Sequence, residues 1–178
     1  MNEKDISDSD SIKKKLLLAS LFLTGFEMLK SSLIDDVKDF YITGFDEKGY
    51  LISSDYNNKV LSKADNHYLA HCLWLVEAKA ITDDDVLELQ KIREYRNTIA
   101  HRLANLLFSE EFNVDVTLLR KMKYYLNIIG RFWGQIEMET STDFKGLKID
   151  YNGIVSGKQM LFDYLISIVD EETAKTKM

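Results

Sequence analysis

The chain has 178 residues, one cysteine and no proline, and its formal charge is −6. This length suits one domain, a single cysteine excludes an intramolecular disulfide framework, and the net negative charge disfavours a protein that coats nucleic acid non-specifically. Because proline breaks helix interiors, its absence favours an all-α fold. We therefore expect one helical domain over residues 1–178, with flexible ends at 1–10 and 174–178, in the reducing cytoplasm.

The longest uninterrupted apolar runs are short, as at residues 16–18 and 73–76. A helix that spans a bilayer needs about 20 apolar residues. The first residues are acidic and polar, unlike a signal peptide. These features predict a protein that does not associate with a membrane.

Amphipathic helices are expected to alternate with two irregular segments. Residues 41–56 lack the helical period and indicate a hairpin or an ordered loop, and residues 141–157 form a second, glycine-containing insertion. Apolar residues at three- and four-residue steps, together with N-cap residues, predict helices over 11–41, 58–80, 83–108, about 116–139 and 158–173. The chain thus predicts a four- to five-helix bundle.

The helix expected after Thr82, an N-cap residue, carries the most informative pattern. At about 100° per residue, its apolar positions fall on one stripe that should face the core: Ile92, Tyr95, Ile99, Leu103 and Leu106. On the opposite side lie Arg93, Asn97 and His101, with Ala100 and Ala104 between the polar groups. The pattern predicts an outward histidine over small residues, where a ligand or a partner helix can approach the backbone.

Positive charge is concentrated in the same stretch of this acidic chain. Between residues 91 and 102, Glu94 is opposed by four basic residues: Lys91, Arg93, Arg96 and Arg102. A charged helix face is often only a solvated surface, and surface ion pairs contribute little stability. The sequence leaves this alternative open beside a binding role for the cations.

Residues 96–101 read Arg-Asn-Thr-Ile-Ala-His and resemble the R-N-x-x-x-H motif of the HEPN superfamily, the nucleotide-binding domains of higher eukaryotes and prokaryotes. The resemblance implies a helical bundle, often a homodimer whose motif helices form a cleft. Many such proteins are metal-independent endoribonucleases of toxin–antitoxin, abortive-infection and RNA-processing systems. Others are inactive and bind nucleotides or partner proteins.

By this resemblance, His101 is expected to be the general acid or base, Arg96 the phosphate contact, and Asn97 the residue that orients the histidine or the substrate. RNA contacts are expected from Arg93, Arg102 and Lys91. Histidine suits proton transfer near neutral pH, and the arginine fork suits the charge that develops on phosphate. The partners would be RNA, a second copy of the chain and an antitoxin protein, with no cofactor and no metal.

Two positions depart from subgroups of the family. Some members carry a tyrosine two residues after the histidine, which a partner nucleotidyltransferase modifies, and this chain has Leu103 there. Glu94 resembles an upstream acidic residue of some active members and is a secondary candidate. The alternatives are a catalytically inactive HEPN module and a helical interaction protein whose motif is accidental.

The other residue patterns in the sequence predict no metal site and no phosphate-binding loop. His67 and His71 stand one helical turn apart, but Tyr68 replaces the glutamate of the zinc-protease motif and no third ligand is evident, so both are expected in packing or on the surface. Residues 153–158 lack the glycine spacing of a phosphate-binding loop. The aromatic residues between 124 and 133 are expected in the core or at a dimer surface.

Overall fold

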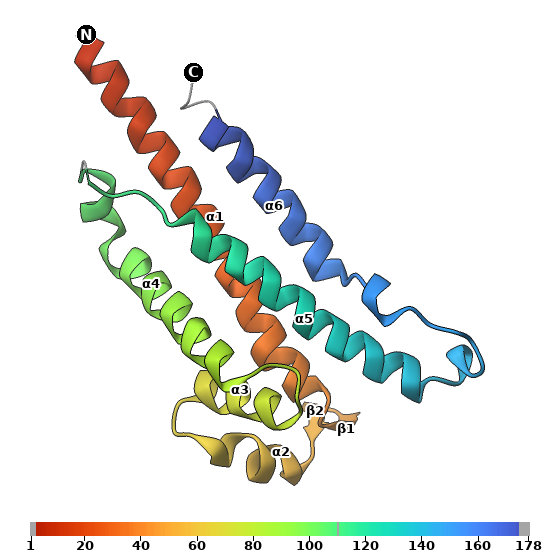
Figure 1. The fold of residues 1–178 in the computed structure, drawn as a ribbon. Coiled ribbons are helices and arrows are strands. Elements are labelled where there is room, and N and C mark those ends of the chain that lie inside the picture. Colours follow the sequence, from red (N-terminus) through yellow and green to blue (C-terminus); the bar gives the residue numbers. More distant parts are fainter. Residues whose placement is uncertain (1–2, 110, 175–178) are drawn as a thin grey trace.

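The computed structural model describes residues 3–109 and 111–174 and shows a helical bundle. Four long helices form its body: α1 (Glu3–Asp39), α4 (Asp83–Leu107), α5 (Val116–Thr140) and α6 (Gly157–Ala174). The short helices α2 (Ser54–Lys59) and α3 (His67–Glu77) lie at one end with the hairpin β1 (Ile42–Asp46) and β2 (Gly49–Ile52), as Figure 1 shows. The prediction of an all-α fold is therefore confirmed.

Helix α1 is the centre of the bundle, because it contacts α3, α4, α5 and α6. Its fully buried face carries Phe22, Leu29 and Leu33. Gly25 lies on this face, where a Cβ atom would stand 2.9 Å from a ring carbon of Phe162 in α6. Helix α1 is continuous at this glycine, which lets α6 approach closely.

Helix α4 begins as predicted, with a reciprocal capping box between Thr82 and Asp85. The predicted apolar stripe faces the core: Ile92 and Ile99 are fully buried, and Tyr95 and Leu103 pack against the core. On the outer side Ala100, His101 and Ala104 are exposed. The local helical period therefore located both faces of α4 correctly.

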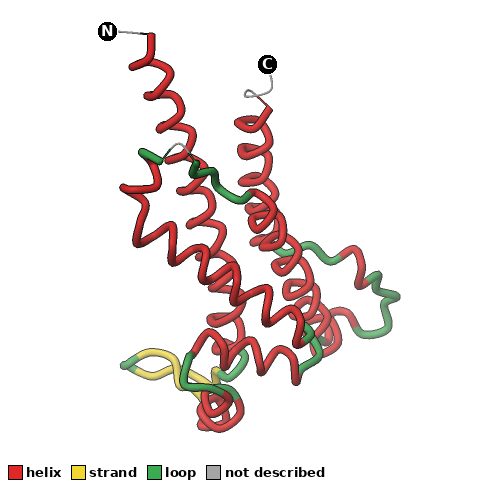
Figure 2. Tube along the Cα trace, turned by 60° about the vertical axis from the view of Figure 1, so that its left-hand side comes forward, coloured by secondary structure: helices red, strands yellow, loops and turns green. Residues whose placement is uncertain are grey.

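The two insertions form where the sequence predicted them. The first contains the antiparallel hairpin, in which Gly49, the first residue of β2, has a left-handed φ of 118°. The second joins α5 to α6 through two short 3₁₀ turns, Thr142–Phe144 and Tyr151–Gly153. In Figure 2 the hairpin and this connection project to opposite sides of the bundle.

Two predicted helix boundaries were wrong. The helix expected over 58–80 is interrupted: α2 ends at Lys59, a 3₁₀ turn covers Leu61–Lys63, and α3 begins at His67 and ends at Glu77. The cause of the restart is Asn66, whose side chain accepts a hydrogen bond from the Leu69 backbone N–H and caps α3. The first helix begins at Glu3 rather than at residue 11, while residues 1–2 and 175–178 of the expected flexible ends lie outside the described residues.

Helix α1 is more apolar as a whole than its short uninterrupted runs suggested. By length and composition its segment Ser9–Asp39 could cross a membrane, with a mean hydropathy of 1.4 over an 18-residue window. Half of that window is buried inside the bundle, as in the core helix of a helical domain. Absence of membrane association and a cytoplasmic location stay predictions.

Candidate functional site

A cleft of about 370 Å³ opens between α1, the start of α3 and α4. Helix α4 contributes Arg93, Arg96 and Asn97 to its lining, three of the residues that the sequence singled out. The remaining lining residues come from α1 and from the beginning of α3: Phe26, Lys30, Ile34, Asn66, His67 and Tyr68. None of these nine lining residues is acidic, so the cleft presents cationic and amide groups to solvent.

Arg96 is held at the cleft by three interactions. Its Nη2 atom lies 2.5 Å from Oε1 of Glu27 in α1, and its Nη1 donates a 3.2 Å hydrogen bond to Oδ1 of Asn97. The guanidinium carbon stands 5.1 Å from the centroid of the Phe26 ring, a cation–π geometry. Its buried Nε atom has no hydrogen-bond partner among the described residues. Arg96 is thus fixed in place with part of its donor capacity unused.

Glu27 balances part of the positive charge around the cleft. It also pairs with Lys30, at 3.1 Å from the ammonium. Burial raises the pKa of Glu27, but hydrogen bonds from Lys30 and Arg96 outweigh this effect, and the net pKa is lowered. Two cationic side chains of the cleft, Lys30 and Arg96, therefore pair with one carboxylate that stays ionised.

Arg93 lies over a second buried aromatic ring. Its guanidinium carbon stands 5.5 Å from the ring centroid of Tyr68, and its Nη1 is 3.5 Å from Oε1 of Gln90. Tyr68 is itself fixed, because its hydroxyl donates to the backbone carbonyl of Leu89. The first turn of α3 adds the partial positive charge of a helix N-terminus near the same place.

The predicted catalytic and RNA-binding residues are only partly brought together. Arg96, Asn97 and Arg93 share the cleft, whereas His101 and Arg102 are exposed farther along α4 and do not line it. Five residues turn a helix by about 500°, so Arg96 and His101 point roughly 140° apart. The secondary candidate Glu94 is exposed and also lies outside the lining.

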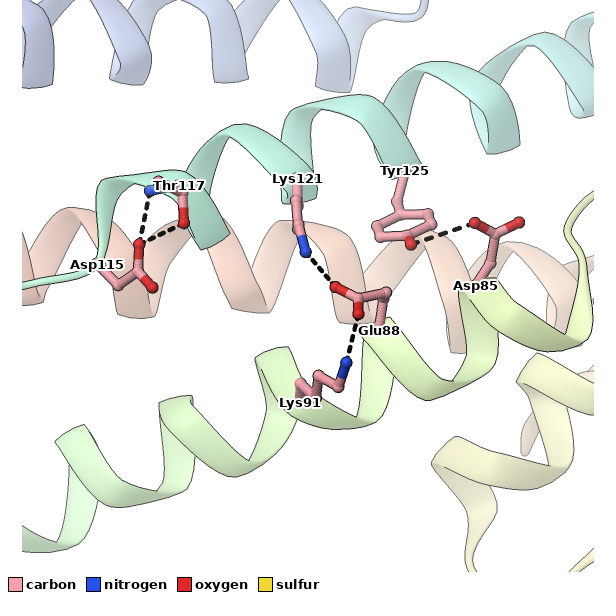
Figure 3. Close-up of polar contacts among 7 residues, drawn as sticks. All are labelled: Asp85, Glu88, Lys91, Asp115, Thr117, Lys121 and Tyr125. Carbon is pink, nitrogen blue, oxygen red and sulfur yellow. Dashed lines mark hydrogen bonds and ion pairs between the residues drawn. The ribbon is translucent and has the colours of Figure 1, made fainter.

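Lys91 lies on the other side of α4, facing α5 (Figure 3). There Glu88 accepts hydrogen bonds from Lys121 of α5 and from Lys91, the latter at 2.5 Å. These bonds lower the pKa of Glu88 to about 2. The Tyr125 hydroxyl donates to Asp85 on the same side, at 3.2 Å. The structure therefore places Lys91 in a helix–helix ion-pair cluster and away from the cleft.

The two α3 histidines have different environments. His71 is fully buried, its Nδ1 donates to the His67 backbone carbonyl at 2.5 Å, and its Nε2 therefore accepts from the Tyr56 hydroxyl at 2.9 Å. This confirms the predicted packing role of His71, whereas His67 is exposed at the cleft. Within residues 3–109 and 111–174, no three His, Cys, Asp or Glu side chains gather as a metal site would require.

Cys72 is not an available nucleophile. It is fully buried, and burial raises the pKa of its thiol to about 12. Two cleft residues were not predicted to bind a ligand there: Lys30 was not named in the sequence analysis, and His67 was considered only as a metal ligand. Their signal was weak, because one belongs to an ordinary amphipathic helix and the other lies beside a predicted packing histidine.

The chain matches no family model, no curated protein and no solved structure. The resemblance of residues 96–101 to the HEPN motif therefore stays a prediction from the sequence.

Proposed function

We propose that the protein is a metal-independent endoribonuclease of the HEPN type, active as a homodimer. The observation that carries the proposal is the arrangement of α4, which presents Arg96 and Asn97 at a basic cleft and His101 on an open surface beside small residues. A second copy packed along this helix would supply a second His101. One imidazole then acts as base and the other as acid.

The chemistry needs proton transfer and charge stabilisation. The base removes a proton from the RNA 2′-hydroxyl, the oxygen attacks the adjacent phosphorus, and the P–O5′ bond breaks as the acid protonates the leaving oxygen. Arg96 donates to the phosphoryl oxygens as their negative charge increases. The products are a 2′,3′-cyclic phosphate and a 5′-hydroxyl, and the formal overall change is a transesterification.

The biological setting follows from the resemblance. A small nuclease of this class would act in the cytoplasm, in toxin–antitoxin or anti-phage defence, with an antitoxin protein that restrains it. Because Leu103 stands where some family members have a modifiable tyrosine, restraint by adenylylation of that position is not proposed. Arg93 and Arg102 are the proposed contacts to the RNA backbone.

A second candidate function is a catalytically inactive HEPN module that binds a nucleotide or a partner protein. One observation favours it: His101 does not line the cleft that holds Arg96 and Asn97. In this alternative the cleft binds its ligand without cleavage, and His101 is a surface residue.

The test compares wild type with His101→Ala, and with Asn105→Ala as a matched control, since Asn105 is exposed one turn farther along α4. Purified proteins are incubated with several RNAs in EDTA, and the ends of the products are identified. We expect His101→Ala to lose cleavage by about 10²-fold or more, because general acid–base catalysis contributes about 10²–10⁴. Helicity and thermal melting should be unchanged in both variants.

Growth gives an independent readout, because expression of an active nuclease should be toxic and expression of His101→Ala should not. Intact RNA after incubation with wild type at several concentrations would favour the binding module. Light scattering addresses the assembly: a strict monomer would remove the second histidine and contradict the mechanism.

A further inference from the structure

We propose that the cleft between α1, α3 and α4 binds a backbone phosphate of single-stranded RNA on a nucleotide that flanks the cleavage position. We call Lys30, His67, Arg93 and Arg96 the basic cleft. Three of these residues lie outside the motif of residues 96–101. The inference rests on the proposed function for the identity of the RNA, while the phosphate recognition stands on the geometry of the cleft.

The aromatic rings of the cleft cannot stack on a base. Phe26 is 2% exposed and Tyr68 is 4% exposed, and their faces are covered by the guanidinium groups of Arg96 and Arg93. A protein that recognises single-stranded bases needs exposed ring faces. The rings therefore position the arginines, and the groups left for a ligand are cationic and amide donors.

The donor set fits an anion with several oxygens. Arginine presents a planar fork that matches two phosphate oxygens, and lysine adds a point charge. Lys30 is exposed at the rim, and the side chains of Asn66 and Asn97 supply neutral donors. Since none of the nine lining residues is a carboxylate, the same set does not suit a divalent cation.

The position of the cleft separates it from the reacting phosphate. Arg93 precedes His101 by eight residues, which places them roughly 12 Å apart along the helix axis. A phosphate held between Arg93 and Lys30 is therefore not the one that His101 of the same chain acts on. It belongs to a neighbouring nucleotide, and its binding would fix the register of the strand.

Glu27 is the carboxylate that a bound phosphate would replace. In the free protein it pairs with both Lys30 and Arg96. The phosphate of the flanking nucleotide competes with this carboxylate for Lys30, and the reacting phosphate competes with it for Arg96. Lys30 and Arg96 are thus paired with an internal anion beside the cleft until the strand arrives, which keeps Arg96 in position without a ligand.

The experiment uses Arg93→Gln, with Lys121→Gln as the matched control. Both remove one positive charge, but Lys121 lies in the ion-pair cluster on α5. Binding of a single-stranded RNA of 12 nucleotides is measured in the His101→Ala background over a range of salt concentrations. We expect Arg93→Gln to weaken binding about tenfold and to lower the salt slope by about one, and Lys121→Gln to change affinity less than about twofold.

Kinetics on the otherwise wild-type enzyme distinguish a flanking contact from a catalytic one. Arg93→Gln should raise KM with kcat retained, because it removes binding that is equal in the ground and transition states. A loss of kcat at unchanged KM would overturn the flanking position. Equal weakening by Arg93→Gln and Lys121→Gln would overturn the cleft, since only overall charge would then matter.

Inorganic phosphate and adenosine monophosphate, titrated with NMR detection, identify the source of the phosphate. RNA binding much tighter than either small probe, and sensitive to Arg93→Gln, supports the proposal. Tight monophosphate binding that is lost in Arg93→Gln, without RNA binding, would overturn the RNA assignment and favour a nucleotide site. If the protein binds RNA through the cleft but does not cleave it, the nuclease proposal is contradicted and the phosphate site is not. Failure of one proposal can therefore be distinguished from failure of the other.

Discussion

The two polar sides of α4 use the same kinds of residue in opposite ways. Toward α5, Glu88 accepts from Lys91 of the same helix and from Lys121 of α5, so all three charges are paired. Toward α1 and α3, Arg93 and Arg96 lie over buried rings and face an open cleft. The first arrangement joins helices, whereas the second leaves cationic donors in reach of a ligand.

The comparison shows why a count of basic residues does not locate a binding surface. Lys91 and Arg93 stand two residues apart, yet the helix turns them toward different neighbours. Lys91 pairs with Glu88, which also pairs with Lys121 of α5, so a phosphate bound by Lys91 would displace a carboxylate that joins two helices. An arginine held over a ring has already lost conformational freedom, so it loses less conformational entropy when a ligand binds.

The largest effect that distinguishes the two sides should come from the floor of the cleft. Phe26→Ala removes a ring that is 2% exposed, and we expect a loss of about 3–5 kcal/mol in the free energy of unfolding. Leu87→Ala on the exposed side of α4 should change it by less than about 0.5 kcal/mol. Urea denaturation measures both, and similar losses would contradict a cleft built on a buried ring.

Local patterns predicted α4 well, because its capping box and helical period depend only on nearby residues. The helix expected from about residue 116 also begins locally, because the side chain of Asp115 caps α5 by accepting from the backbone N–H of Thr117. The interruption between α2 and α3 was missed because apolar residues continue through it, as at Val60 and Leu61, and no proline or glycine marks it. The Asn66 cap is a local signal of the interruption.

The cleft itself could not be predicted from the sequence. Lys30 and His67 are far from Arg93 along the chain, and their proximity results from how α1 and α3 pack against α4. The pairing of Arg96 with Glu27 has the same origin. Sequence reasoning found the face of α4 that carries Arg93 and Asn97, but tertiary packing decided which cations share that face.

The protein should become less stable in acid because of His71, a buried histidine bonded to the backbone of a cleft residue. Burial is the main cause that lowers the pKa of His71, whose Nδ1 donates to the backbone carbonyl of the cleft residue His67. Because the folded protein keeps His71 neutral, its contribution to stability is complete above about pH 6.5, the unfolded value, and declines as the pH falls below it. Thermal melts between pH 8 and 5 should show this decline.

The control for the acid effect is His67→Gln, which changes an exposed neighbouring histidine. The melting temperature of this variant should decline with falling pH as that of wild type does. Tyr56→Phe should destabilise the protein at pH 8 by about 1–3 kcal/mol, because it leaves the buried Nε2 of His71 without a donor. A pH dependence that disappears in His67→Gln would assign the effect to the wrong histidine.

A smaller effect, on RNA affinity, is expected from substitution of Glu27, the carboxylate that pairs with two cations of the cleft. Glu27→Gln removes the carboxylate that competes with phosphate for Lys30 and Arg96, so RNA affinity should rise by about two- to fivefold. Glu88→Gln removes an equal charge on the α5 side and should leave RNA affinity nearly unchanged. Fluorescence anisotropy at one salt concentration compares the two, and an equal rise in both would indicate a general charge effect.

The smallest expected effect is the change in melting temperature when Glu88, in the ion-pair cluster of Figure 3, is replaced. Hydrogen bonds from Lys121 and Lys91 lower the pKa of Glu88 to about 2, so its contribution to stability is present above about pH 4.5 and is lost as the pH falls through about 2. The melting temperature of Glu88→Gln should therefore lie slightly below that of wild type at pH 7 and converge with it near pH 2. Solvent screening keeps the difference small, because both lysines remain hydrated when the carboxylate is removed. A difference that persists at pH 2 would mean that Glu88 stabilises the α4–α5 contact by packing and not by its charge.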